Sequence, residues 1–120
     1  MEYSESRKFE ELIYASYPLF SYLSREQINA VDMNVLWVPS NDDHALIDAL
    51  GAMLDKHVVI YNPTCEPKKG HLCRMIKAAV LESNQIKEVQ AVEQKLGDKD
   101  KVLVVYEKPI MLNPHFNAVE

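Results

Sequence analysis

The pattern of apolar and polar positions divides the chain into extended and helical segments. Three short apolar runs, at residues 35–38, 58–61 and 102–106, are typical of buried strands. Between the first two runs, apolar residues recur at helical spacing; they are Leu46, Ile47, Leu50, Met53 and Leu54. This order predicts a strand–helix–strand unit. Because the runs are continuous and do not alternate with polar residues, both faces of each strand should be covered, which favours a parallel sheet.

The same spacing predicts helices at the start of the chain. Residues 9–20 present apolar side chains at helical spacing, and Pro18 should end or kink that helix. Ser24 begins a second, short helix, because Gln27 follows it at the spacing of a capping box. Ser40 has the same relation to Asp43 at the start of the helix between the first two strands.

Two further helices are predicted in the second half of the chain. Apolar residues at helical spacing cover residues 72–80 and residues 86–96, and Gly97 is expected to cap the second of these helices. Residues 88–92 could instead form an edge strand.

Together these segments predict one α/β domain, since 120 residues are typical of a single domain. The expected fold is a small sandwich, in which helices cover both faces of a three- to four-stranded, mostly parallel sheet. Residues 1–33 would form a helical N-terminal segment, residues 34–108 the strand–helix core, and residues 109–120 a partly ordered tail.

Charge and hydropathy restrict the environment and the class of partner. With 18 acidic and 13 basic residues the formal charge is −5, which does not favour nucleic acid as a partner. No apolar run approaches the roughly 20 residues of a membrane-spanning helix, and the start of the chain lacks the pattern of a signal peptide. We therefore expect a cytoplasmic protein without a membrane partner, and Cys65 and Cys73 as free thiols.

A candidate ligand site lies where chain segments leave the predicted strands. Parallel sheets bind ligands beyond the carboxyl ends of their strands. The polar residues expected there are Asp42, Asp43, His44, Cys65 and Lys108. The alternative interpretation of the two aspartates is that they stabilise the first turn of a helix.

A second candidate is an anion site at the start of the helix predicted over residues 72–80. Free backbone N–H groups there, next to basic side chains, could hold a phosphate or carboxylate; the residues are Lys68, Lys69, His71 and Arg74, with Lys77 extending the patch. A solvated basic loop is the alternative. The spacing of Cys65, His71 and Cys73 does not match the paired ligands of structural zinc sites, so neither a metal nor a cofactor is expected.

Aromatic residues are concentrated at the start of the chain. Tyr3, Tyr14 and Tyr22 are left over after the residues expected to cover the sheet, and tyrosine is favoured at protein–protein contacts. No nucleophile-elbow motif is present, which does not favour an enzyme. The sequence therefore favours a non-enzymatic protein-interaction module, such as an adaptor, inhibitor or immunity-type protein, with self-association left open. The alternative is a small ligand-binding or enzymatic domain.

The stretch from Val35 to Tyr61 also resembles a known family. Its order of strand, turn rich in Asn and Asp, helix and strand is similar to the core of the psi accessory subunit of bacterial clamp loaders. The resemblance implies an accessory role in a replication clamp loader. The region after Thr64, with its long helix, departs from the family's pattern.

Overall fold

The computed structural model describes residues 2–66 and 70–113, with side chains described from Lys8 onward. The elements, with η denoting a 3₁₀ helix, are α1 (Glu2–Ser16), η1 (Pro18–Tyr22), α2 (Arg25–Asn29), η2 (Met33–Val35), α3 (Asn41–Leu54), β1 (His57–Tyr61), α4 (Leu72–Met75), α5 (Ser83–Lys95) and β2 (Val102–Tyr106). The residues of the predicted tail beyond Asn113 lie outside the described part.

The sheet in the described residues consists of two antiparallel strands, so the prediction of a three- to four-stranded, mostly parallel sandwich is wrong. The register pairs His57 with Tyr106 at one end and Tyr61 with Val102 at the other. A continuous apolar run shows that a strand is covered on both faces, and four of the five residues of β1 are indeed buried. Such an apolar run carries no information on whether the neighbouring strand is parallel or antiparallel.

The first predicted strand, at residues 35–38, is replaced by a 3₁₀ turn and an extended segment. The Asp32 carboxylate accepts the Asn34 N–H at 3.0 Å and thereby caps η2. The segment that follows lies along β1, where the Trp37 N–H donates to the Ile60 carbonyl at 2.9 Å. A single bridge between Leu36 and Tyr61 is antiparallel. The first strand implied by the resemblance to the psi family is therefore absent.

An irregular segment also covers the free side of β2. The helix predicted over residues 72–80 ends at Met75, and the chain then runs beside β2. Ala79 donates its N–H to the Val105 carbonyl at 2.9 Å, and the Glu107 N–H donates to the Lys77 carbonyl at 3.2 Å. Both sides of the strand pair are thus occupied by the protein's own backbone, which protects the sheet from pairing with another chain.

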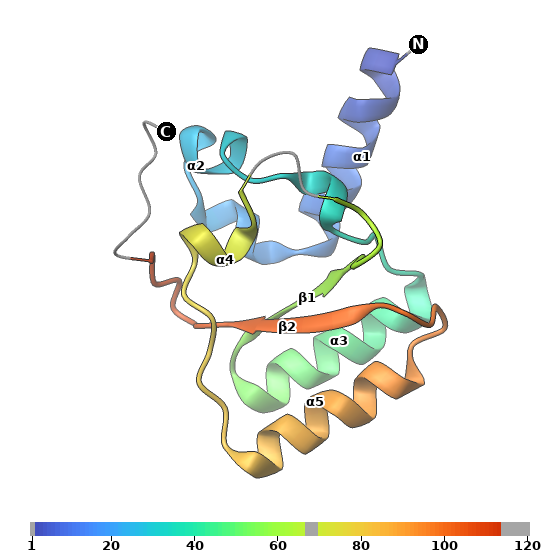
Figure 1. Cartoon of the computed structure of the whole chain (residues 1–120), viewed down its shortest axis with the longest axis vertical. Helices are drawn as coiled ribbons and strands as arrows, with labels where there is room; N and C mark the ends of the chain where they lie inside the picture. The colour runs from blue at the N-terminus through green and yellow to red at the C-terminus, as the bar shows by residue number, and fades with distance from the viewer. Residues whose placement is uncertain (1, 67–69, 114–120) are drawn as a thin grey trace.

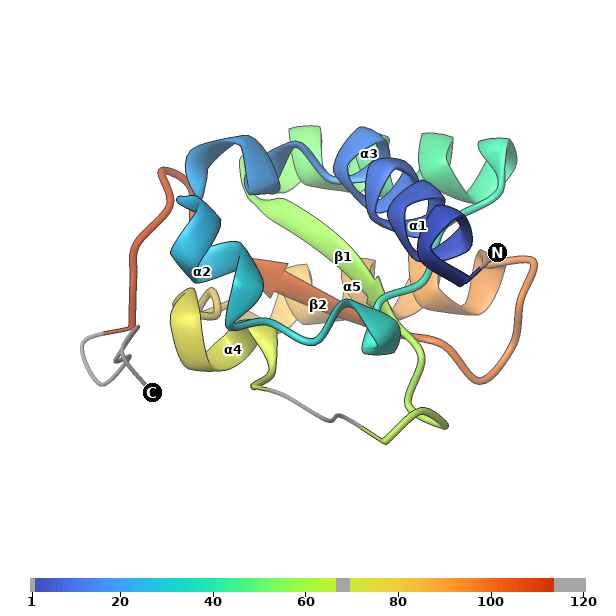
Figure 2. The ribbon, with the colours of Figure 1, turned by 90° about the horizontal axis from the view of Figure 1, so that it is seen from above.

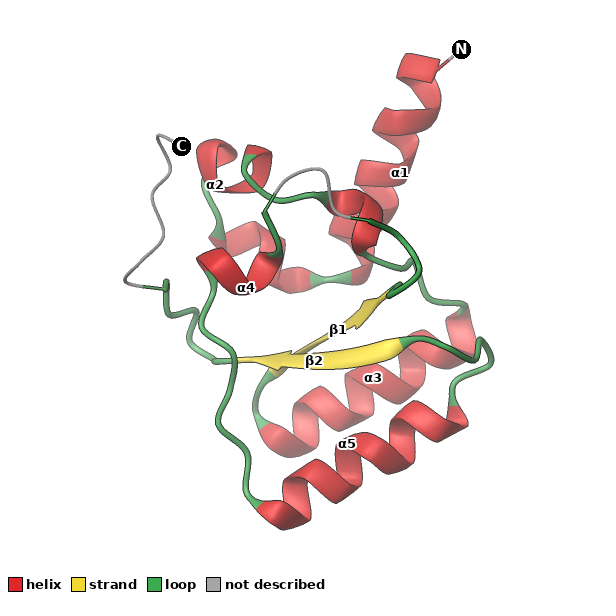
Figure 3. Ribbon diagram, in the orientation of Figure 1, coloured by secondary structure: helices red, strands yellow, loops and turns green. Residues whose placement is uncertain are grey.

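Helices lie on either side of the strand pair. Helices α3 and α5 pack side by side below it, whereas α1, η1, α2 and α4 lie above it (Figures 1 and 3). Figure 2 shows the same arrangement from above, with the strands between the two groups. Residues 88–92 belong to helix α5, which excludes the alternative of an edge strand.

The ends of the helices partly follow the sequence signals. The capping box of α2 is confirmed, because Ser24 and Gln27 exchange both hydrogen bonds, at 2.8 and 3.2 Å. In α3, the Ser40 hydroxyl accepts the Asp43 N–H at 3.2 Å, but the Asp43 carboxylate does not bond back to Ser40. Asp43 is only 4% exposed, and its two carboxylate oxygens accept the Gly97 N–H at 3.0 and 3.2 Å. Gly97 thus links the end of α5 to α3.

Removal of this link should destabilise the fold. Asp43→Ala loses a charge-assisted hydrogen bond as well as its interaction with the helix dipole, so we expect the free energy of unfolding to fall by about 2 kcal/mol. Asp42, its exposed neighbour in the same turn, is the matched control, and Asp42→Ala should cost less than about 1 kcal/mol. Urea unfolding at pH 7 measures both variants. Equal losses would show that the bond to Gly97 contributes nothing.

The Tyr17 hydroxyl joins three parts of the fold. It donates to the Trp37 carbonyl and accepts the Ile60 N–H at 3.2 Å, so it ties the chain between α1 and η1 to β1 and to the segment beside it. Burial raises the pKa of Tyr17, although the bond from Ile60 acts in the opposite direction. Burial also raises the pKa values of Tyr61 and Tyr106, whose hydroxyls bond to each other at 2.6 Å.

These tyrosines predict loss of stability in alkali. The folded state holds their protons more tightly than the unfolded chain does, so the stabilisation is complete below about pH 10 and falls as the pH rises further. Each tyrosine should contribute a slope of about 1.4 kcal/mol per pH unit above that point. Chemical unfolding between pH 8 and pH 11 measures the slope. Tyr17→Phe should be less stable at pH 8 and show a shallower slope; an unchanged slope would contradict this assignment.

Candidate functional site

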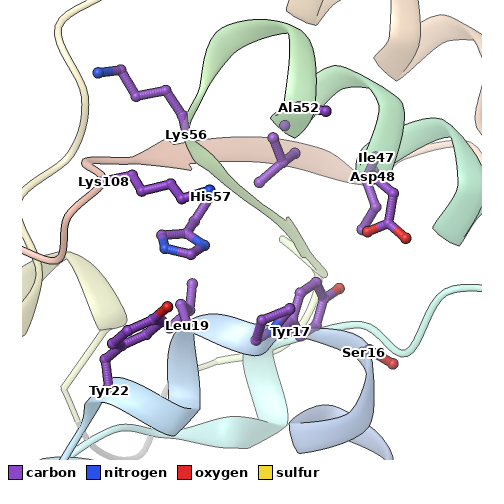
Figure 4. Close-up of a pocket in the computed structure, with 13 residues that line it drawn as sticks. Ser16, Tyr17, Leu19, Tyr22, Ile47, Asp48, Ala52, Lys56, His57 and Lys108 are labelled. Carbon is purple, nitrogen blue, oxygen red and sulfur yellow. The ribbon is translucent and has the colours of Figure 1, made fainter.

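A pocket of about 280 Å³ lies between η1 and the helix α3 (Figure 4). The end of α1, the start of β1 and the segment after β2 complete its walls. Its apolar lining includes Tyr17, Leu19, Ile47, Ala52 and Val58. Charged and hydrogen-bonding side chains stand at its two ends, so the pocket combines an apolar lining with a polar rim.

Gly51 is needed where the pocket wall passes from α3 into β1. The Lys56 N–H donates to the Gly51 carbonyl at 3.0 Å, which folds the chain back at the end of the helix. A Cβ atom on Gly51 would come within 3.0 Å of the Lys56 carbonyl oxygen. Asp55, between them, takes the left-handed conformation with φ of 56°. This tight turn places His57 at the mouth of the pocket.

Tyr22, His57 and Lys108 meet at one end of the pocket. The antiparallel register pairs His57 with Tyr106, and Lys108 follows two residues later, close enough for its charge to act on the His57 imidazole. The rings of Tyr22 and His57 are 6.0 Å apart between centroids. Figure 4 shows the Lys108 and Tyr22 side chains reaching toward the His57 ring, whereas Lys56 points away from it. The helix η1, the strand β1 and the segment after β2 thus each supply one polar side chain to this end of the pocket.

The electrostatics of this end favour a neutral imidazole beside a cation. Burial lowers the pKa of His57, the positive charge of Lys108 lowers it further, and Asp55 partly opposes them. The imidazole is therefore neutral at pH 7. Within the described part of the chain, Lys108 has one long ion pair, with Asp55 at 3.6 Å, between side chains that are 48% and 84% exposed. Lys56, in contrast, is held by Glu107 at 3.1 Å.

The opposite end of the pocket is acidic. Asp48 lines it, and one carboxylate oxygen lies 3.3 Å from His44 Nδ1. The other ring nitrogen of His44 contacts the Ser16 carbonyl oxygen at 3.2 Å, which connects α3 to the end of α1. The pocket therefore has a basic end, an apolar middle and an acidic end.

The residues predicted to form a ligand site at the sheet edge are dispersed. Lys108 lines the pocket and His44 lies beside it, but Asp42 is exposed at the start of α3 and Asp43 is buried against Gly97. Cys65 follows the end of β1 opposite His57, and its sulfur accepts from the Asn62 amide at 3.2 Å. Their convergence required parallel strands, which the structure does not have.

The anion site predicted before α4 stays a prediction. Lys68 and Lys69 lie outside the described residues. His71 precedes α4 without a side-chain cap, and its ring lies 6.4 Å from that of Tyr61. Arg74 is in α4, a helix of only four residues.

Among the three tyrosines predicted for protein contact, Tyr22 presents its ring to solvent. It is 65% exposed. Tyr14 packs against Phe20 with 5.8 Å between ring centroids, and its buried hydroxyl has no hydrogen-bond partner among the residues that the structure describes. The side chain of Tyr3 lies outside the described residues. His57 and Asp48 were missed by the sequence reasoning, because a histidine before a strand and an aspartate within a helix give no signal of a pocket.

Searches of the described residues for a metal site and for a membrane-spanning helix, and comparisons with known proteins, gave no candidate. No group of three or more His, Cys, Asp or Glu side chains there could hold a metal ion. Nor does any helix described here have the length and apolar character needed to cross a bilayer. Comparisons with models of known protein families, with characterised proteins and with solved structures give no match.

Proposed function

We propose that the protein is a non-enzymatic interaction module, of the adaptor, inhibitor or immunity type, which binds a partner protein through the pocket and Tyr22. One observation carries the proposal: an exposed tyrosine stands at the rim of a pocket with an apolar lining and a polar rim. Protein interfaces concentrate their binding energy where an anchor side chain fills such a pocket, surrounded by polar contacts that exclude water.

Tyr22 is suited to such a contact. Its ring already packs at 6.0 Å from the His57 ring, which limits the freedom that it would lose on binding. Tyrosine also buries a large area and keeps a hydroxyl for hydrogen bonding. The Tyr22 side chain should therefore contribute more binding free energy at an interface than an exposed aliphatic residue of similar size.

The pocket has little of the arrangement that a hydrolase needs. Ser16 lines it, but the Ser16 hydroxyl donates to the Leu12 carbonyl at 2.8 Å within its own helix. His44 contacts the Ser16 carbonyl oxygen and Asp48, so the imidazole does not activate the hydroxyl. A nucleophile needs a base within hydrogen-bonding reach. This arrangement favours binding over nucleophilic catalysis.

We propose that the module works in the cytoplasm. Cys65 and Cys73 are both free thiols, which is typical of proteins in reducing compartments. The net charge of −5 is consistent with a protein partner rather than with nucleic acid.

Substitution of Tyr22 tests the proposed interface. A partner recovered with the wild-type chain from the cells that express it should bind Tyr22→Ala at least about tenfold more weakly, because an interface anchor is lost. Met53→Ala is the matched control: Met53 is 58% exposed on α3, and the pocket lining does not include it. Its affinity, measured by calorimetry, should change less than about twofold. Equal losses, or none, would contradict the assignment of this surface.

A further inference from the structure

The geometry points to a carboxylate-binding subsite at the end of the pocket formed by Tyr22, His57 and Lys108. The corresponding partner is a protein segment that places an acidic side chain there and an apolar side chain against the pocket lining. This inference rests on the proposed function, since it gives the chemistry of the partner that the interaction module would bind.

Three groups at this end can hold a carboxylate. The Lys108 ammonium supplies a positive charge, and the Tyr22 hydroxyl and the His57 imidazole can each donate a hydrogen bond. They come from the segment after β2, from η1 and from β1, and Figure 4 shows the Lys108 and Tyr22 side chains extending toward His57. Such charge-assisted hydrogen bonds are stronger than neutral ones. The arrangement can therefore select a negative group.

The present partner of Lys108 is easily replaced or shared. The ion pair with Asp55 spans 3.6 Å and is exposed to solvent, and pairs of this kind contribute about 1 kcal/mol or less. Lys56 is different, because Glu107 holds it at 3.1 Å and the side chain points away from His57. Of the two described lysines that line the pocket, Lys108 is thus the one available to an incoming carboxylate.

Charge also fixes the direction in which a segment would bind. Asp48 at the opposite end repels a carboxylate and accepts donors, so the acidic group of the partner belongs at the Lys108 end. Between the two ends, the apolar lining would receive the neighbouring side chain. A volume of about 280 Å³ lies below the roughly 300–1,000 Å³ typical of pockets for drug-sized ligands. It suits one side chain of a protein segment.

Phenylacetate is a suitable probe, because it joins an apolar group to a carboxylate as the inferred segment does. Phenylacetamide is its neutral control. Titration of the isotope-labelled full chain with each compound, followed by NMR signals of Tyr22, His57 and Lys108, gives the two dissociation constants. We expect phenylacetate to bind at least about threefold more tightly than phenylacetamide, as one solvent-exposed ion pair would provide.

Two variants separate this subsite from general charge effects. Lys108→Gln should abolish the preference for phenylacetate. Lys87→Gln, which removes a lysine from the exposed side of α5, should retain it. Unfolding curves of both variants confirm that they are folded. A preference that persists in Lys108→Gln, or that disappears equally in both variants, would overturn the assignment.

Titration of His57 gives a second readout. Among the described residues, the charged groups that face it are Lys108 and Asp55, and the ring of Tyr22 packs beside it. A bound carboxylate favours the imidazolium, so saturation with phenylacetate should raise the pKa of His57, and binding should strengthen as the pH falls through that pKa. Phenylacetamide should leave the pKa unchanged. Equal effects of the two compounds would contradict the subsite.

The outcomes distinguish this inference from the proposed function. If phenylacetate and phenylacetamide bind equally at this pocket, the carboxylate subsite is wrong, whereas docking of a partner at Tyr22 still stands. If the partner itself binds Tyr22→Ala as tightly as the wild type, the interface is wrong whatever the probe does. Binding of phenylacetate away from Tyr22, His57 and Lys108 would also overturn the subsite.

Discussion

The antiparallel pairing of β1 with β2 is the constraint on which the rest of the structure depends. Its register places His57 opposite Tyr106, and so brings Lys108 to the same end of the strands as His57. A parallel pair would have put these residues at opposite ends. The basic end of the pocket is therefore a direct consequence of strand direction, and Tyr22 is added to it by the fold-back of the N-terminal segment over the strands.

Two strands alone are a marginal structure in water, so this pair relies on its surroundings. Irregular segments bond to both of its sides, through Trp37 beside β1 and Ala79 beside β2. The Tyr17 hydroxyl, from the N-terminal part of the chain, also bonds to the backbone of β1, because it accepts the Ile60 N–H. Two helices close the opposite face, and the Asp43 carboxylate joins them through Gly97. Each of these contacts links segments that are distant in the sequence.

The sequence allowed the local elements to be predicted where a local signal exists. The capping box at Ser24, the helical spacing in α3 and α5, and the apolar runs of β1 and β2 are all such signals. The prediction of a strand at residues 35–38 was wrong, because Asp32 caps a 3₁₀ turn there. An apolar run does not distinguish a strand that is paired along its length from an extended segment with few backbone hydrogen bonds. The candidate site was predicted in part, through Tyr22 and Lys108. His57 and Asp48 were missed, because their positions on the pocket wall depend on strand direction and on the fold-back at Gly51.

Nuclear Overhauser contacts between the two strands test the central claim most directly. The antiparallel register predicts contacts of Val58 with Val105, of Val59 with Val104 and of Ile60 with Leu103, so that the partner's number falls as the residue number rises. It also predicts slow hydrogen exchange of the Trp37 and Ala79 amides, which donate to the outer sides of the pair. Contacts whose partner numbers rise together along both strands would indicate a parallel pair, and the pocket built on this register would be contradicted.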